Sequence, residues 1–304
     1  MKKVLKWIGI VLGSLAGLIL IAAVGLYAKG MSEFNKTYEA QVRLVEIPAD
    51  AESIEHGRHL ADFLCAECHG DDLGGKPVFV DLPGMVTIST PNITSGQGGV
   101  VAGFTDEDWI RSLRHGIKQD GTSSFLMRSM DYQYFSDKDL RDVIAYLKTA
   151  PPVDREIPPY QMTFLGRVAY GAGAFGNLLG ASIIDHENLP TSTVEAGVTV
   201  EYGEYLIDIN GCRGCHGVEL AGATPPDPTS MLAPNLTPGG SLASWSEADF
   251  IQTIRTGIVP EGRRLVLQFM PWEYKGRMTD DELTAIFLYL QSLPALETST
   301  APVE

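Results

Sequence analysis

The sequence predicts an all-α protein in which two tandem small helical domains follow an N-terminal transmembrane helix. The chain begins with a long uncharged apolar run, a series of sequence landmarks occurs twice in the same order, and each copy ends in a segment with apolar residues at helical spacing. The expected parts are a membrane anchor (1–30), a linker (31–52), domain 1 (53–153), an interdomain linker (154–200), domain 2 (201–296) and a tail (297–304).

The apolar run WIGIVLGSLAGLILIAAVGLYA covers residues 7–28. At about 1.5 Å per residue, a helix of this length crosses a hydrocarbon core of about 30 Å. Lys2, Lys3 and Lys6 precede the run and favour a cytoplasmic N-terminus. A cleaved signal peptide is the alternative, but its apolar core usually has only about 7–15 residues. We therefore expect a single-pass anchor in the cytoplasmic membrane, with both domains in the periplasm.

The charge of the chain is strongly negative, at −15. Four of the 23 basic residues precede residue 31, whereas all 38 acidic residues follow it. Nucleic acid is therefore excluded as a partner, because binding to phosphates requires a basic face. The acidic surface is either simply solvated or steers the domains toward a basic patch on a protein partner.

All four cysteines lie in two copies of one motif, CAECHG (65–70) and CRGCHG (212–217). The other landmarks recur around them in matching order. In the first copy they are GRHL (57–60), PNIT (91–94), FTDEDW (104–109), LRHGI (113–117) and SDKDLRDVIAYLKTAPPV (136–153). In the second they are GEYL (203–206), PNLT (234–237), WSEADF (245–250), IRTGI (254–258) and TDDELTAIFLYLQSLPAL (279–296). Such agreement indicates a duplicated domain of about 100 residues.

Helix starts are readable within each copy. Ser136 and Thr279 precede the last helix and have an acidic residue three positions later, as a capping box requires. Thr105 and Ser246 open a shorter helix in the same way. No stretch of six or more residues alternates convincingly, so we expect no sheet. The Gly-rich segment 154–200 is expected to be a linker that packs on the domains, and the tail is expected to fray.

C-x-x-C-H is the covalent attachment signature of c-type haem. Two thiols bind the two vinyl groups of one porphyrin, and the histidine after the second cysteine is then close enough to ligate the iron. The sequence therefore predicts two haem c groups. The first would be held by Cys65 and Cys68 with His69 on the iron, and the second by Cys212 and Cys215 with His216.

Three other roles for the cysteines fit less well. A Cys₄ zinc site could use two C-x-x-C pairs, but it needs neither a histidine after each pair nor a duplicated domain. Four cysteines in such close pairs cannot form a disulfide framework that stabilises a chain of this length. A thioredoxin-like site would have one motif opening a helix after a strand.

Each repeat resembles a class I cytochrome c domain, over about residues 55–153 and 203–295. The PN-[IL]-T segment, the R-H-G-I or R-x-G-I turn and the M-P-x-x-x-Y loop are similar to those of the cytochrome subunits of bacterial membrane-bound alcohol and sugar dehydrogenases. Those subunits commonly carry three haems, whereas this chain has two attachment motifs.

The resemblance implies that a methionine shortly before the last helix is the second iron ligand. Met127 and Met270 each lie nine residues before the cap of that helix. The first copy departs from the family at Arg128, where a proline is expected, and Met130 is an alternative ligand there. His59 and His115 are further candidates should Met127 not ligate, although solvated or core histidines are expected.

Four residues at matched positions could contact the haem propionates. They are Arg114 and Arg255, for which a salt bridge is the alternative, and Asn92 and Asn235, which could instead hold a turn together with Thr94 and Thr237.

A haem iron with histidine and methionine ligands has no open position for a substrate, and a thioether ligand raises its potential. We expect an electron-transfer protein rather than an enzyme. It would pass single electrons from a dehydrogenase or quinol-oxidising complex of the respiratory chain to an acceptor such as a terminal oxidase or another cytochrome. The alternative is a dihaem redox enzyme, of peroxidase or thiosulfate-oxidising type, with one open haem.

Overall fold

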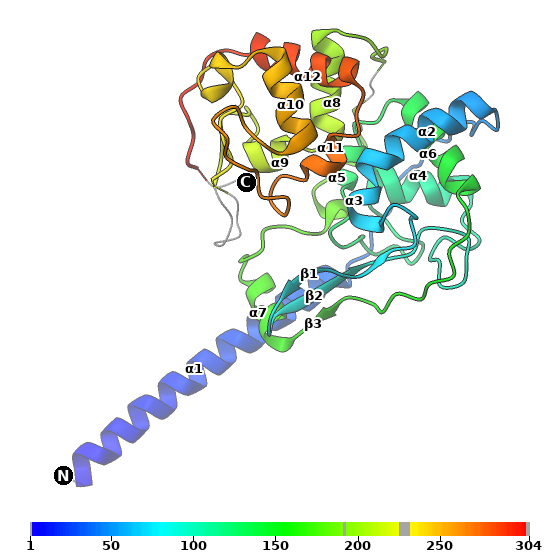
Figure 1. The fold of residues 1–304 in the computed structure, drawn as a ribbon. Coiled ribbons are helices and arrows are strands. Elements are labelled where there is room, and N and C mark those ends of the chain that lie inside the picture. The colour runs from blue at the N-terminus through cyan, green and yellow to red at the C-terminus, as the bar shows by residue number, and fades with distance from the viewer. Residues whose placement is uncertain (1, 191–192, 225–231, 302–304) are drawn as a thin grey trace.

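A computed structural model describes residues 2–190, 193–224 and 232–301. A single long helix, α1, projects from a body that contains two groups of helices (Figure 1). The helices are α1 (Lys2–Phe34), α2 (Ala51–Leu64), α3 (Ala66–His69), α4 (Asp106–His115), α5 (Ser129–Tyr132), α6 (Asp137–Thr149), α7 (Phe164–Gly171), α8 (Val200–Ile209), α9 (Arg213–His216), α10 (Glu247–Thr256), α11 (Trp272–Lys275) and α12 (Asp280–Ser292), with 3-10 turns η1 (Gly180–Ser182) and η2 (Ser241–Ser244). The strands are β1 (Lys76–Leu82), β2 (Val86–Thr90) and β3 (Gln161–Met162).

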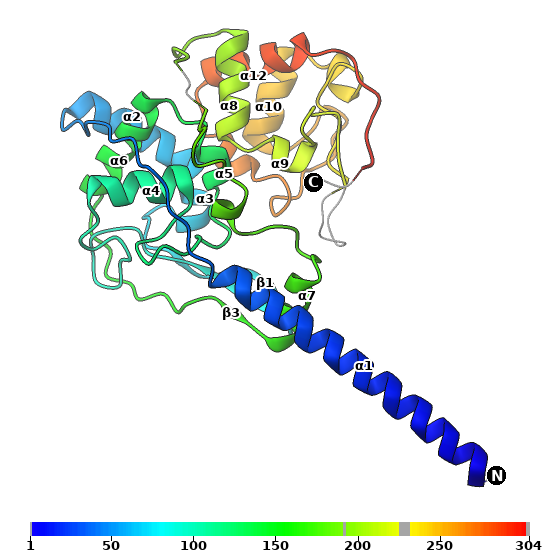
Figure 2. The same cartoon turned by 180° about the vertical axis from the view of Figure 1, so that it is seen from behind.

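The two groups of helices repeat one arrangement. Helices α2 to α6 form domain 1 and helices α8 to α12 form domain 2, in the same order. The first and last helices of each domain pack against each other, α2 on α6 and α8 on α12 (Figure 2). The prediction of two tandem helical domains behind an apolar helix is confirmed.

A glycine permits the close contact of the first and last helices in each domain. A Cβ atom on Gly57 of α2 would lie 1.8 Å from the carbonyl oxygen of Asp142 on α6. A Cβ atom on Gly203 of α8 would lie 2.0 Å from the carbonyl oxygen of Ala285 on α12. Both neighbours are backbone atoms of a packed helix, so the two helices must separate if a side chain is added.

We expect Gly57→Ala and Gly203→Ala each to lower the free energy of unfolding by about 1–3 kcal/mol, the usual cost of overpacking a core. Denaturant titration of the full chain in detergent, followed by far-UV circular dichroism, measures this loss. Gly197→Ala is the control, because its Cβ would meet its nearest neighbour at an ordinary 3.9 Å. Equal midpoints for Gly57→Ala and Gly197→Ala would contradict the prediction.

The predicted helix caps are present. The side chains of Thr105, Ser246 and Thr279 form complete capping boxes with the acidic residue three positions later. The side chain of Ser136 accepts a hydrogen bond from the backbone N–H of Asp139, but the Asp139 carboxylate does not accept one from the backbone N–H of Ser136. Instead the hydroxyl of Tyr205, on α8 of domain 2, accepts from the Ser136 N–H at 3.1 Å and donates to the Asp139 carboxylate. A contact between the domains thus replaces half of this box.

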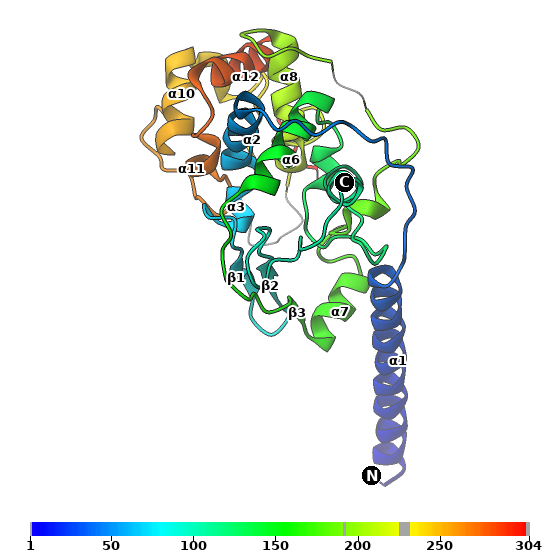
Figure 3. The same cartoon turned by 90° about the vertical axis from the view of Figure 1, so that its right-hand side faces the viewer.

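The expectation of no sheet is wrong. Strands β1, β2 and β3 form an antiparallel sheet in the order β1-β2-β3, in which β1 and β2 are a hairpin and β3 comes from the interdomain segment. The sequence pattern does not reveal these strands, because they are short and because β1 has no consistently buried face. Figure 3 shows the sheet between domain 1 and α7.

The interdomain segment has more structure than a linker, because it contains β3, α7 and η1. The expectation of a frayed tail is also wrong for residues 297–301. The N–H of Ser299 donates to the carbonyl oxygen of Ala221, and that of Thr224 donates to Ala301, each at 2.8 Å. Residues 302–304 lie outside the described residues.

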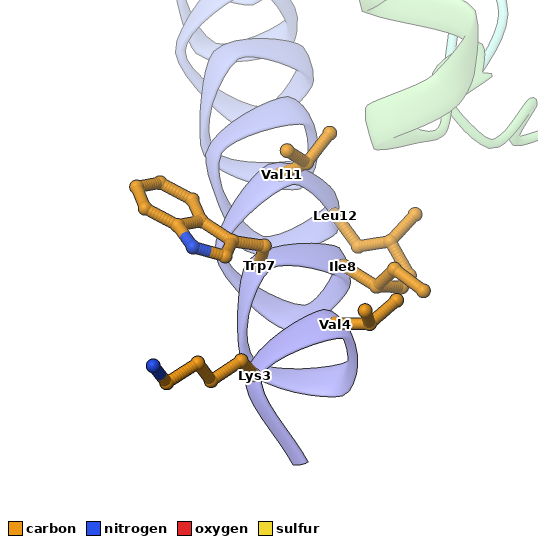
Figure 4. Close-up of a pocket in the computed structure, with 6 residues that line it drawn as sticks. All are labelled: Lys3, Val4, Trp7, Ile8, Val11 and Leu12. Carbon is orange, nitrogen blue, oxygen red and sulfur yellow. The ribbon is translucent and has the colours of Figure 1, made fainter. Parts of the chain in front are cut away.

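Two apolar clusters organise the body. The larger is continuous across both domains and includes Phe63 and Tyr132 of domain 1 with Tyr205 and Leu206 of domain 2. The smaller surrounds the sheet and joins it to α7 and to Phe34, at the end of α1. By contrast, the first twenty residues of α1 touch neither cluster, and their apolar side chains are exposed. In the N-terminal turns, the labelled side chains, from Lys3 to Leu12, project away from the helix axis (Figure 4).

Candidate haem sites

The first attachment motif is built on a helix end. Helix α2 ends at Leu64, and the short helix α3 carries the chain from Cys65 to His69. Residues three positions apart share a face of a helix, so both thiols are presented on one side. Gly70 then adopts φ 81°, a left-handed conformation that ends α3 directly after the histidine.

The histidine of each motif is oriented by a proline carbonyl. Nδ1 of His69 donates to the carbonyl oxygen of Pro91 at 2.8 Å. In the second motif Nδ1 of His216 donates to the carbonyl oxygen of Pro234 at 2.9 Å. A ring whose Nδ1 carries the hydrogen has its lone pair on Nε2 when it is neutral. Both imidazoles are therefore in the tautomer that can ligate a metal through Nε2.

Burial determines the protonation of the motif side chains. It lowers the pKa of His69 and of His216, which keeps both rings neutral and able to ligate at neutral pH. Burial raises the pKa of Cys65 to about 12 and that of Cys68 to about 11. Cys212 has its pKa raised to about 11 for the same reason. These thiols are neutral at physiological pH, unlike those of thiolate-dependent redox sites.

The alternative roles of the cysteines find no support in this arrangement. All four cysteines are free thiols. In the part of the chain that the structure describes, no three histidine, cysteine, aspartate or glutamate side chains gather in a group that could hold a metal ion. The two C-x-x-C pairs therefore do not converge on a common zinc site. The donor set, two neighbouring thiols and an oriented neutral imidazole in each repeat, fits covalently attached haem.

The two predicted methionine ligands occupy equivalent loops. Met127 precedes α5 and Met270 precedes α11, and both are partly buried against the large apolar cluster. The Met270 N–H donates to the carbonyl oxygen of Val266 at 2.9 Å, which closes the loop in front of Pro271. The alternative, Met130, lies within α5 with 37% of its surface exposed. The structure thus favours Met127, and both ligand assignments stay predictions.

The matched arginines bind the start of the last helix. Arg114 is 3% exposed and donates to the carbonyl oxygen of Phe135 at 2.6 Å and to the Asp137 carboxylate at 2.9 Å. Arg255 donates to the carbonyl oxygen of Gly276 and, at 2.6 Å, to the carboxylate of Asp280. This geometry matches the salt-bridge alternative, and propionate contacts remain a prediction.

The matched asparagines each tie a turn to the segment after the last helix. The side-chain oxygen of Asn92 accepts from the N–H and the hydroxyl of Thr94, while its amide donates to the carbonyl oxygen of Val153 at 2.7 Å. Asn235 makes the same contacts with Thr237 and the carbonyl oxygen of Leu296. Their amide groups therefore hold the PN-[IL]-T turn, whose proline carbonyl orients the histidine.

The histidines outside the two motifs make hydrogen bonds elsewhere in the protein. Nε2 of His59 hydrogen-bonds to Glu282 of domain 2 at 2.9 Å, and this bond raises the pKa of His59. Burial lowers the pKa of His115 to about 4, and its Nδ1 lies 3.1 Å from Nδ1 of His186. Each of these rings already has a protein partner.

Comparison with known proteins accounts for the duplicated pattern. A model of the cytochrome c family matches residues 54–151 and 200–294, which is more than half of the chain. The chain belongs to the cytochrome c family. Membership supports haem c binding and a role in electron transfer, and its two domains fit two haems.

Curated relatives of this cytochrome include two dehydrogenase cytochrome subunits and one diheme cytochrome. It is 29% identical to the fructose dehydrogenase cytochrome subunit of Gluconobacter japonicus, over 82% of this chain and 54% of that one. It is 27% identical to a diheme cytochrome c-type of Cereibacter sphaeroides, over 77% and 83%. It is 26% identical to the cytochrome c subunit of the alcohol dehydrogenase (quinone) of Gluconobacter oxydans, over 82% and 56%. The cytochrome thus spans about half the length of the dehydrogenase subunits.

Sequence reasoning missed two cations that join the domains of this cytochrome. Arg128 donates through Nη2 to the carbonyl oxygen of Asn210 at 2.9 Å and through Nε to Asp131 at 3.0 Å. Lys275 donates through Nζ to the carbonyl oxygen of Phe63 at 3.1 Å. In the sequence, Arg128 stands out only because the family has a proline at this position. Nothing in the sequence signalled Lys275, because its partner lies 212 residues away.

Proposed function

We propose that this cytochrome is a membrane-anchored dihaem relay that passes single electrons at the periplasmic face of the cytoplasmic membrane. Its donor would be a dehydrogenase or a quinol-oxidising complex, and its acceptor a terminal oxidase or another cytochrome. Haem c, when bound, supplies a one-electron couple at its iron. The observation that carries the proposal is the pair of motifs with oriented histidines, held against each other by contacts from the opposite domain.

The contacts between the domains are reciprocal. Arg128 follows the methionine loop of domain 1 and reaches Asn210, two residues before the first cysteine of domain 2. Lys275 follows the methionine loop of domain 2 and reaches Phe63, two residues before the first cysteine of domain 1. Each domain therefore clamps the segment that leads into the other's attachment motif. A fixed arrangement of the two sites is what electron exchange between them requires.

Burial makes this clamp costly to break. Lys275 is 7% exposed, and burial lowers its pKa. A buried cation that loses its hydrogen-bond partner carries the full desolvation cost. The apolar cluster shared by both domains and the Tyr205 contact with Ser136 add to the rigidity of the interface. These contacts support a single, fixed orientation of the two domains.

The proposed membrane attachment rests on α1. Among the described residues, α1 is the one helix long and apolar enough to cross a membrane. Lys2, Lys3 and Lys6 lie before its apolar part. The positive charge at this end supports a cytoplasmic N-terminus and hence periplasmic domains.

The proposed partner is a dehydrogenase that oxidises an alcohol, a sugar or a sugar acid. The relatives are named as cytochrome subunits of fructose, alcohol and gluconate dehydrogenases. All 38 acidic residues of this chain lie outside the anchor, so we expect the partner to offer a basic docking face.

Carbon monoxide binding distinguishes the relay from a dihaem redox enzyme. With a methionine on each iron, the dithionite-reduced full chain in detergent is expected to show no carbon monoxide difference spectrum. An open or labile haem would bind the gas rapidly, and this outcome would favour the peroxidase or thiosulfate-oxidising alternative. A second measurement tests the partner, since adding the dehydrogenase's substrate to native membranes should reduce the haem of this chain. Absence of reduction by alcohols, sugars and sugar acids would argue against this class of donor.

A further inference from the structure

Helix α7 presents two large apolar side chains to solvent. Phe164 and Leu165, in its first turn, are 53% and 54% exposed. Neighbouring residues of α7 are used for packing, since Gly166, Tyr170 and Gly171 are buried. About half of the surface of each of these two side chains therefore stays uncovered by the protein.

Close backbone contacts clamp α7 to the C-terminal part of α1. A Cβ atom on Gly171 would lie 2.0 Å from the carbonyl oxygen of Leu26, and one on Gly30 would lie 2.9 Å from that of Arg167. The ring of Phe164 stacks on Tyr27, with centroids 5.1 Å apart. These contacts hold the C-terminal part of α1 directly against α7 of the body (Figure 3).

The residues of α1 that contact α7 show where α7 lies along the proposed membrane span. Leu26 and Tyr27 belong to the last turn of the apolar run 7–28, whose helical length of about 33 Å matches a hydrocarbon core of about 30 Å. Lys29 and Glu33, which form an ion pair at 4.0 Å, follow directly. Tyr27, on which Phe164 stacks, is thus at the outer end of the apolar run, where aromatic residues favour the membrane interface.

The charged residue of α7 points further along α1. Nη1 of Arg167 lies 2.9 Å from the sulfur of Met31, and its guanidinium lies 5.9 Å from the ring centroid of Phe34. Both partners lie beyond the apolar run. Helix α7 thus places an aromatic residue toward the span and its cation away from it, as interfacial helices do.

The β-sheet supports α7 in this position. The N–H of Thr163 donates to the carbonyl oxygen of Met85 at 2.9 Å, and its hydroxyl donates to that of Gly84 at 2.8 Å. Both acceptors lie at the turn of the β1–β2 hairpin. A Cβ atom on Gly166 would lie 2.3 Å from the same Met85 oxygen. The hairpin therefore fixes the start of α7, where the exposed pair lies.

We propose that Phe164 and Leu165 insert into the interfacial layer of the bilayer and form a second membrane contact beside α1. The inference rests on the proposed anchoring by α1 and adds to it. A helix alone allows the body to tilt and rotate, whereas two contacts joined by a rigid clamp fix the orientation of both domains relative to the membrane. The face that a membrane partner can reach would then be set by the fold.

Photocrosslinking in native membranes tests this contact. The full chain is made with p-benzoylphenylalanine in place of one of three exposed leucines: Leu165, Leu18 within the apolar run, or Leu44. Their exposed fractions are 54%, 65% and 64%. Leu44 is the matched control, because it lies in the segment beside α6, next to the ion pair of Arg43 and Asp137. After irradiation, mass spectrometry of the purified chain detects a mass shift of one phospholipid.

We expect the mass shift of one phospholipid at positions 165 and 18, and no such shift at position 44. A shift at 18 without one at 165 would overturn the inference and leave the anchor intact. A protein adduct at 165 in place of lipid would also overturn it, and would indicate that a partner subunit covers α7. Absence of lipid at 18 would contradict the proposed anchor itself, and lipid at 165 would then show that α7 contacts the membrane on its own.

Discussion

Alanine at both Cys65 and Cys68 is expected to halve the covalently bound haem of the chain. Both cysteines lie on one helical turn together with the oriented His69. Their replacement would therefore remove both thioether bonds of the first haem. The second motif lies in a separate domain with its own cysteines, histidine and proline carbonyl. The pyridine haemochrome assay, together with intact mass, measures haem per polypeptide.

The duplicated domain provides the matched controls. Replacing Cys212 and Cys215 should give the same loss, and replacing all four cysteines should leave no covalent haem. Cys65 is 6% exposed, so its replacement also removes a core contact. The haem retained in domain 2 reports whether the chain still folds. A variant that kept two haems after losing Cys65 and Cys68 would refute the assignment of the first site.

Histidine in place of either predicted methionine ligand is expected to lower the midpoint potential of one haem by hundreds of millivolts. A thioether favours ferrous iron more than an imidazole does, and axial ligands tune haem potentials over about 0.8 V. Met127→His should shift the first haem and Met270→His the second, while the partner haem keeps its potential. An optical redox titration of the full chain resolves the two components.

Met130→His distinguishes the two candidates in domain 1. Met130 is 37% exposed and is the second residue of the four-residue helix α5, so we expect its replacement to leave both potentials nearly unchanged. A large shift with Met130→His, and none with Met127→His, would assign the ligand to Met130. If none of the three variants altered a potential, methionine ligation as a whole would be wrong.

Short-range patterns made much of this fold predictable. The caps at Thr105, Ser246 and Thr279 involve partners three residues away, and each forms as the sequence predicts. The haem motifs are similarly local, because the cysteines and the histidine share a single helical turn. The sheet was not predictable in this way. Strand β3 is two residues long and pairs with a strand more than 70 positions earlier.

The apolar helix, the duplicated helical domain and the two attachment motifs with their histidines could all be predicted from the amino-acid sequence. All of these are encoded by spacings of a few residues, which backbone geometry converts directly into a helical face or a cap. The contacts between distant segments depend instead on how the chain packs: Tyr205 at the cap of α6, Arg128 and Lys275 on the segment before the opposite domain's motif, and α7 against α1. Such contacts depend on how complete surfaces pack, and no local spacing specifies the partner of a side chain that lies tens or hundreds of residues away.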